Sequence, residues 1–134
     1  RPGIAGVSDN ITVRSVVGRF LEHHRLFYFH NGGNESLFLS SADWMPRNLN
    51  ERVELMIPIE DKRHKERVKG ILDLYLEDTL KAHIMRADGS YRKINDREHP
   101  ISAQEELMKE AIAREHKESM TVIERLQPMF KMNK

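Results

Sequence analysis

The sequence contains no cysteine. This absence excludes disulfides, thiolate metal sites and cysteine nucleophiles, and it suits a reducing cytoplasm, where we expect the protein to be located. No run approaches the ~18 apolar residues of a membrane span, and the N-terminus lacks the pattern of a signal peptide. The chain has 134 residues and begins Arg1-Pro2. We therefore expect a single domain, residues 1–134, excised from a longer protein.

A strong charge of one sign is also absent, because 22 Lys and Arg nearly balance 21 Asp and Glu. This balance argues against binding nucleic acid or a membrane surface by bulk electrostatics. Lysine is missing before Lys62, and all six earlier basic side chains are arginines. Arginine binds phosphate or carboxylate through a planar fork, so an anion site is predicted in this half. Pairing of these arginines with nearby acidic residues is the alternative.

The order of strand and helix patterns predicts an α/β domain with a short mixed sheet. Two runs of β-formers flank an Asn-Gly-Gly turn and predict a hairpin at about 26–41. The first run is apolar on both faces, which predicts a covered position inside the sheet. A further strand is expected near 53–57 and a brief one at 91–94. An earlier strand at 11–14 is expected to lead into a helical turn.

Two long helices, at about 62–84 and 103–126, are predicted to cover this sheet. Asp61 can cap the first helix, which carries an apolar stripe on one face and charges on the other. Ser102 and Glu105 have the spacing of a capping box at the start of the second helix.

Four ionisable residues, Glu22-His23-His24-Arg25, stand just before the first hairpin strand. Loops at strand ends often carry active-site groups. Histidine transfers protons near neutral pH and arginine holds an oxyanion, so the group suits phosphoryl chemistry. A histidine pair that merely ends an element is the alternative. The other histidines lack the spacing of metal ligands, so we expect no metal site in this chain.

A second group, Ser40-Ser41-Ala42-Asp43, follows the second hairpin strand and leads to Arg47. Its hydroxyl and backbone N–H groups can bind an oxyanion, and Asp43 can orient a neighbouring imidazole or guanidinium. Arg47 can reach a phosphate. Because the two hairpin strands should be neighbours, both groups are expected at one site.

The sequence resembles a known family. The runs RPGIAGVSDNITVRSVVGRFLEHHRLFYFHNGG and LFLSSADWMPRNLNERVELMIPI are similar to the last domain of the long-chain polyphosphate kinases, over roughly residues 1–94. These kinases resemble phospholipase D in their two C-terminal domains, each of which gives one histidine to a shared site. His23-His24-Arg25 stands for the phospholipase His-x-Lys pattern, and residues 40–43 stand for its Gly-Ser-x-Asn segment.

The resemblance implies a phospholipase-D-like layered domain and reversible transfer of the terminal phosphate of ATP to polyphosphate. An upstream domain of the same parent chain would carry the phosphohistidine. The family motif Glu-His-Ser-Arg aligns with Glu22–Arg25, so the assisting histidine, which also contacts the nucleotide phosphates, is His23. His24 stands where serine is usual, and an extended backbone would point the two rings in opposite directions. Phosphate binding is assigned to His23, Arg25, Arg47 and Ser41, and an orienting role to Asp43.

The same resemblance implies that ATP or ADP and polyphosphate are the substrates and that Mg²⁺ is held mainly by upstream domains. The parent is expected to be a homo-oligomer without a membrane span or a nucleic-acid partner, and it could lie peripherally at a membrane. Two other readings remain open. One is a phospholipase-D-like phosphodiesterase half-site, although Arg25 in place of lysine argues against it. The other is a non-catalytic polyanion-binding or assembly module.

Overall fold

The computed structural model describes residues 1–130, with the side chains of 1–118, 120 and 121. Strands and helices follow in the order β1 (Arg14–Val16), β2 (Leu26–Phe29), β3 (Ser36–Ser40), α1 (Pro46–Glu51), β4 (Met56–Pro58), α2 (Lys62–Glu77), β5 (Ala82–Met85), β6 (Tyr91–Lys93) and α3 (Ala103–Phe130), with a 3₁₀ turn at Asn31–Gly33. The α/β class predicted from the sequence is confirmed.

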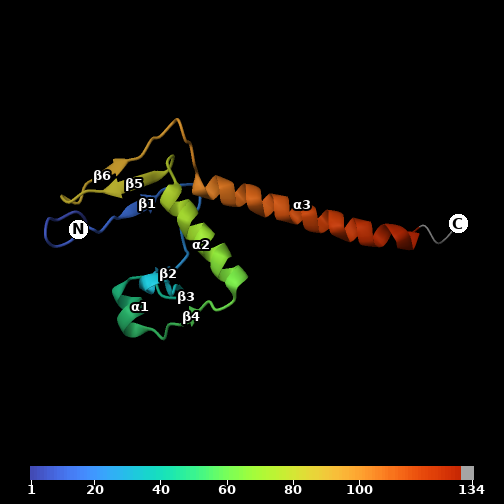
Figure 1. Cartoon of the computed structure of the whole chain (residues 1–134), viewed down its shortest axis with the longest axis horizontal. Helices are drawn as coiled ribbons and strands as arrows, with labels where there is room; N and C mark the ends of the chain where they lie inside the picture. Colours follow the sequence, from blue (N-terminus) through green and yellow to red (C-terminus); the bar gives the residue numbers. More distant parts are fainter. Residues whose placement is uncertain (131–134) are drawn as a thin grey trace.

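The strands form two small sheets rather than the one mixed sheet that was predicted. One sheet has the order β1-β5-β6 and the other β2-β3-β4, and every pairing is antiparallel. The sheets lie near opposite ends of α2, and α3 projects away from both of them (Figure 1). The expectation that both long helices cover one sheet is therefore wrong for α3.

The hairpin predicted at 26–41 is confirmed as β2 and β3, which pair from Leu26 with Leu39 to Phe29 with Ser36. Its turn needs positive φ angles, which Gly32 and Gly33 supply at 63° and 100°. The position predicted for the first strand is wrong, because β3 is the central strand and β2 lies at the edge.

Several predicted boundaries are corrected by long-range pairing. The strand near 53–57 is β4 at Met56–Pro58, which pairs with β3. The strand at 11–14 is β1 at Arg14–Val16, and it pairs with β5 in place of leading into a helical turn. The brief strand at 91–94 is confirmed as β6. The helix α1 was not predicted; Pro46 stands at its first position, where a proline ring favours helix initiation.

The helix predicted at 62–84 ends earlier, at Glu77. The Asp61 cap is confirmed, since its carboxylate accepts hydrogen bonds from the backbone N–H groups of Arg63 and His64 at 2.9 and 3.1 Å. Beyond Glu77 the chain turns and enters β5, because these residues pair with β1 instead of continuing the apolar stripe of the helix.

The helix predicted at 103–126 is α3, which extends to Phe130 through Pro128. The predicted capping box is wrong: the Ser102 hydroxyl is buried without a hydrogen-bond partner among the described residues, and the cap comes from Asp78. One Asp78 carboxylate oxygen accepts from the N–H of Ala103 at 2.8 Å, and the other accepts from Lys81 and Ala82 at 2.7 and 2.9 Å. Asp78 is fully buried and thereby joins α2, β5 and α3.

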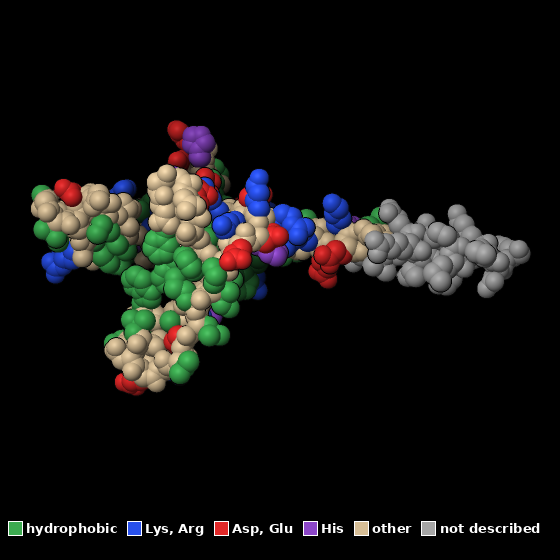
Figure 2. All heavy atoms as spheres, turned by 60° about the horizontal axis from the view of Figure 1, so that its bottom comes forward, with side chains coloured by type: hydrophobic (Ala, Val, Ile, Leu, Met, Phe, Trp, Pro, Cys, Tyr) green, Lys and Arg blue, Asp and Glu red, His purple; other side chains and the backbone are tan. Residues whose placement is uncertain are grey.

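Ionic contacts link α2 to its neighbours. Arg67 pairs with Glu110 of α3 at 2.8 Å, and Lys69 pairs with Glu35 of the hairpin at 3.1 Å. On the face shown in Figure 2, hydrophobic side chains gather near the base of α3, and charged side chains of both signs are spread along that helix. Within residues 1–130, no helix is both long enough and apolar enough to cross a bilayer.

Replacing Asp78 tests whether this carboxylate anchors the fold. Asp78→Ala leaves three backbone N–H donors unpaired, two of them buried, so we expect the free energy of unfolding to fall by ~3–5 kcal/mol. Asp73→Ala, an exposed substitution on α2, should change it by less than ~0.5 kcal/mol. Urea unfolding of the 134-residue chain measures both. Equal effects of the two substitutions would contradict the role of Asp78.

Candidate functional site

The two polar groups predicted to share a site lie side by side at one end of the hairpin. The Ser40 N–H donates to the Arg25 carbonyl at 2.8 Å, and this bond brings the ends of β2 and β3 together. Residues 21–25 lead into β2 without regular secondary structure, and residues 41–45 leave β3 toward α1. The expected proximity of the two groups therefore follows from the hairpin pairing.

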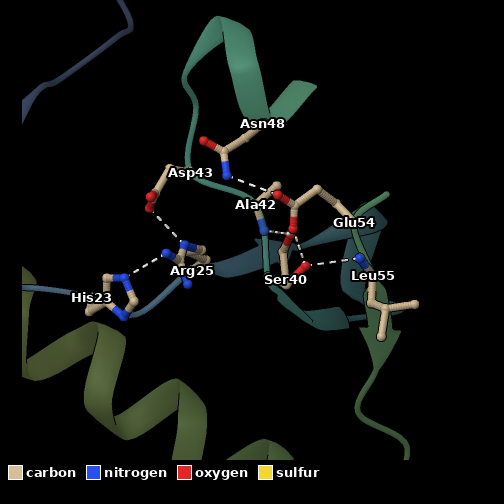
Figure 3. A network of polar contacts seen from close by, with 9 residues as sticks. His23, Arg25, Ser40, Ala42, Asp43, Asn48, Glu54 and Leu55 are labelled. Atoms are coloured by element: carbon tan, nitrogen blue, oxygen red, sulfur yellow. Dashed lines mark hydrogen bonds and ion pairs between the residues drawn. The ribbon is translucent and has the colours of Figure 1, made fainter. Parts of the chain in front are cut away.

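Arg25 is the centre of the first cluster (Figure 3). Its Nε–H donates to Asp43 Oδ1 at 2.7 Å, and its Nη2 lies 2.6 Å from His23 Nε2. The hydrogen bond with Asp43 raises the pKa of Arg25 above its ordinary value. The same bond, aided by the positive charges of Arg25 and Arg47, lowers the pKa of the Asp43 carboxyl. The cluster thus holds a fixed guanidinium and an ionised carboxylate beside an exposed imidazole.

The contact with Arg25 fixes the proton of the His23 ring. A guanidinium donates hydrogen bonds and cannot accept them, so His23 Nε2 must be the acceptor. The neutral ring then carries its proton on Nδ1, which makes no hydrogen bond within the described part of the chain. His23 therefore presents an N–H donor to an incoming group while its other nitrogen is held by Arg25.

His24 belongs to a different environment. Its Nε2 lies 3.4 Å from a carboxylate oxygen of Glu22, and its ring meets the Tyr75 ring of α2 edge-on with centroids 4.7 Å apart. Burial, together with the nearby Glu22 carboxylate, raises the pKa of Tyr75. The two adjacent histidines thus contact different parts of the molecule.

Ser41 takes part in a second network, which the sequence did not reveal. Its hydroxyl donates to Glu54 and accepts from the Leu55 N–H at 2.9 Å. The buried Asn48 side chain donates to the other Glu54 oxygen at 2.8 Å. These hydrogen bonds lower the pKa of Glu54. The Ser41 hydroxyl is thus already bonded to Glu54 and Leu55 here, and its phosphate-binding role stays a prediction.

The remaining predicted residue, Arg47, is exposed in the first turn of α1, close enough for its charge to act on Asp43. Glu54 and Asn48 were missed because a single Glu in a strand-like run and a single Asn in a turn-like segment carry no local signal. Among the side chains that the structure describes, those of residues 1–118, 120 and 121, no cluster of three His, Asp or Glu could hold a metal ion.

Comparison with known proteins connects this geometry to one family. The family model described as "Polyphosphate kinase C-terminal domain 2" matches residues 1–104. The chain is 58% identical over 95 residues to the polyphosphate kinase of Pseudomonas aeruginosa, a match that covers 71% of this chain and 14% of that protein. It is 47% identical over 114 residues to the polyphosphate kinase of Rhodopirellula baltica, a match that covers 84% of this chain and 13% of that protein.

A solved structure is also similar. The crystal structure of polyphosphate kinase from Porphyromonas gingivalis superposes with a TM-score of 0.74 at 35% sequence identity, and the match covers 82% of this chain and 17% of that one. The chain thus spans a small fraction of the length of the relatives and the structure that it matches.

The lowered pKa of Asp43 predicts how its pairing with Arg25 depends on pH. A carboxyl whose pKa is lower in the folded state contributes stability above its unfolded pKa of ~3.9 and loses that contribution as the pH falls through the folded pKa. The stability difference between the native chain and Asp43→Asn should therefore be constant above pH ~5 and shrink below pH ~4. Urea unfolding at several pH values measures this. A difference that stays constant down to about pH 2 would refute the assignment.

Proposed function

The chain belongs to the polyphosphate kinase C-terminal domain 2 family, and on this premise we propose that it forms one half of a composite active site. The parent enzyme would reversibly transfer the terminal phosphate of ATP to inorganic polyphosphate through a phosphohistidine in an upstream domain. Residues 1–134 would form a single phospholipase-D-like C-terminal domain that supplies the second histidine, His23. The contact between His23 and Arg25 is the observation that best supports this proposal.

His23 would act as a hydrogen-bond donor on the nucleotide side. Because Nε2 accepts from Arg25, the ring proton lies on Nδ1, and this Nδ1–H can donate to a phosphate oxygen. As negative charge develops on the oxygen that leaves the transferring phosphorus, a donor at this position lowers the barrier.

Arg25 and Arg47 would neutralise phosphate charge beside this histidine. Arg25 bonds Asp43 through Nε, so Asp43 fixes the plane of the guanidinium and leaves part of its fork for an oxyanion. Arg47 is exposed and lies beyond Asp43, where it can contact a more distant phosphate of a nucleotide or a polymer. Ser41 would join them only if its bond to Glu54 opens.

Magnesium does not fit the carboxylates of this site. Asp43 is engaged by Arg25, and both oxygens of Glu54 accept hydrogen bonds from Ser41 and Asn48. Mg²⁺ prefers several oxygen ligands in octahedral geometry, and these side chains do not supply that set. We therefore place the magnesium ligands in upstream domains of the parent and assign no step to the metal here.

The partners of this chain follow from the same proposal. ATP, ADP and polyphosphate would bind between it and the upstream domains, in a cytoplasmic parent that assembles as a homo-oligomer. Because the phosphorylated histidine would lie upstream, the isolated chain should show no turnover. Polyphosphate synthesis by the purified 134-residue chain would refute the composite site.

Separate substitution of the two histidines in the full-length parent enzyme tests the assignment. His23→Ala should reduce polyphosphate synthesis at least ~100-fold, because it removes the donor beside Arg25. His24→Ala is the matched control, since this ring contacts Glu22 and Tyr75, and it should leave the rate within ~3-fold of the native enzyme. The reverse order of effects would show that His24 is the functional histidine.

A further inference from the structure

The segment that carries His23 has no regular secondary structure between the end of β1 and the start of β2. One end is held where the Val17 N–H donates to the Lys81 carbonyl at 3.2 Å, and the other where Arg25 pairs with Ser40. For residues 18–24, the only backbone hydrogen bonds that the described chain provides are made with the side chain of Gln104. The position of His23 between the two sheets therefore depends on this side chain.

Gln104 is the second residue of α3 and is only 6% exposed. Its Oε1 accepts from the Phe20 N–H at 3.1 Å, and its Nε2 donates to the Phe20 carbonyl at 2.8 Å. These two hydrogen bonds resemble the pair that two residues exchange between neighbouring antiparallel β-strands. The same Nε2 also donates to Glu22, so both N–H groups and the oxygen of the amide are used. A buried side chain that makes three hydrogen bonds to one loop segment fixes that segment.

Gly18 provides the space for this contact. A Cβ atom placed on Gly18 would lie 2.7 Å from Gln104 Cδ, which is too close for any carbon pair. The φ angle of Gly18 is not positive, so an alanine could adopt this backbone conformation without strain. An added methyl group would instead displace the end of the flexible Gln104 side chain.

We propose that Gln104 is a positioning residue that holds the Glu22-His23-His24-Arg25 motif from α3. The start of α3 is itself fixed, since Asp78 accepts the N–H of Ala103, the residue before Gln104. From Gln104 the restraint passes to Phe20 and Glu22, and Glu22 in turn contacts His24. These contacts fix the position of the backbone just before residues 23–25. They thereby fix the position of the His23 ring relative to Arg25. The catalytic consequence of this restraint rests on the proposed function.

Activity of the full-length parent enzyme tests that consequence. Gln104→Leu keeps the size of the side chain but removes its hydrogen bonds, and it should lower kcat for polyphosphate synthesis ~10- to 100-fold while KM for ATP stays within ~3-fold. Gly18→Ala should have a similar effect. Because both changes break one contact, the double variant should be no slower than the slower single variant. The exposed Glu105→Gln, one residue further along α3, is the control and should be neutral.

A second readout, independent of activity, is the histidine ring spectrum of the 134-residue chain. ¹H–¹³C NMR should show the ring signals of His23 and His24 shifted in Gln104→Leu and Gly18→Ala, with those of His64 and His116 unchanged. Unmoved His23 and His24 signals in both variants would overturn the proposal, whatever the kinetics show. If Gln104→Leu does not fold, the His23 and His24 ring signals of Gly18→Ala alone test the proposal.

The two readouts separate this proposal from the proposed function. If the ring signals shift but His23→Ala leaves synthesis intact, Gln104 still positions the motif and the function assigned to His23 is wrong. If His23→Ala abolishes synthesis while Gln104→Leu and Gly18→Ala retain native kcat, the function stands and the catalytic importance of Gln104 is refuted.

Discussion

Three segments of the chain meet at the buried carboxylate of Asp78. It follows the last residue of α2, it accepts N–H groups at the entry to β5, and it caps the first turn of α3. Its backbone carbonyl also accepts from Arg14 of β1 at 2.9 Å. The buried hydrophobic residues that form the core of the described chain are few, namely Leu37, Ala42, Ile59, Ala82 and Ala103. In so small a core, a carboxylate that satisfies three backbone donors largely determines where the elements meet.

The candidate site is held between this anchor and the hairpin. On one side, Gln104 extends from the anchored start of α3 to the loop before His23. On the other side, β2 and β3 place Arg25 against Asp43. The histidine that faces Arg25 and the histidine that faces Tyr75 are neighbours in sequence, yet their rings lie in different environments. The anchor and the hairpin therefore act together in presenting one imidazole beside one guanidinium.

Features that depend on neighbouring residues were predictable from the sequence, and features that depend on distant ones were not. The hairpin follows from β-formers around Asn31–Gly33, and the Asp61 cap is local. The early end of α2 was missed because Ala82–Met85 pair with β1, far away in sequence. The capping box failed for the same reason: Asp78, not Ser102, binds the N–H of Ala103.

In the candidate site too, contacts between residues of one local motif were predictable and contacts between distant elements were not. A contact between Arg25 and Asp43 could be expected, because Arg25 precedes β2 and Asp43 follows β3 in the same hairpin. Glu54 and Gln104 could not be found, since their partners lie on other elements and neither residue belongs to a recognisable local motif. Burial and hydrogen bonding identify them only once the chain is folded.

The central claim is that His23 and Arg25 together face a phosphate group of the nucleotide. A structure of the full-length parent enzyme with a non-hydrolysable ATP analogue tests this most directly. We expect an oxygen of a bound phosphate within hydrogen-bonding distance of a His23 ring nitrogen and of the Arg25 guanidinium, with His24 still against Tyr75. A phosphate bound by His24, or one distant from both His23 and Arg25, would contradict this assignment.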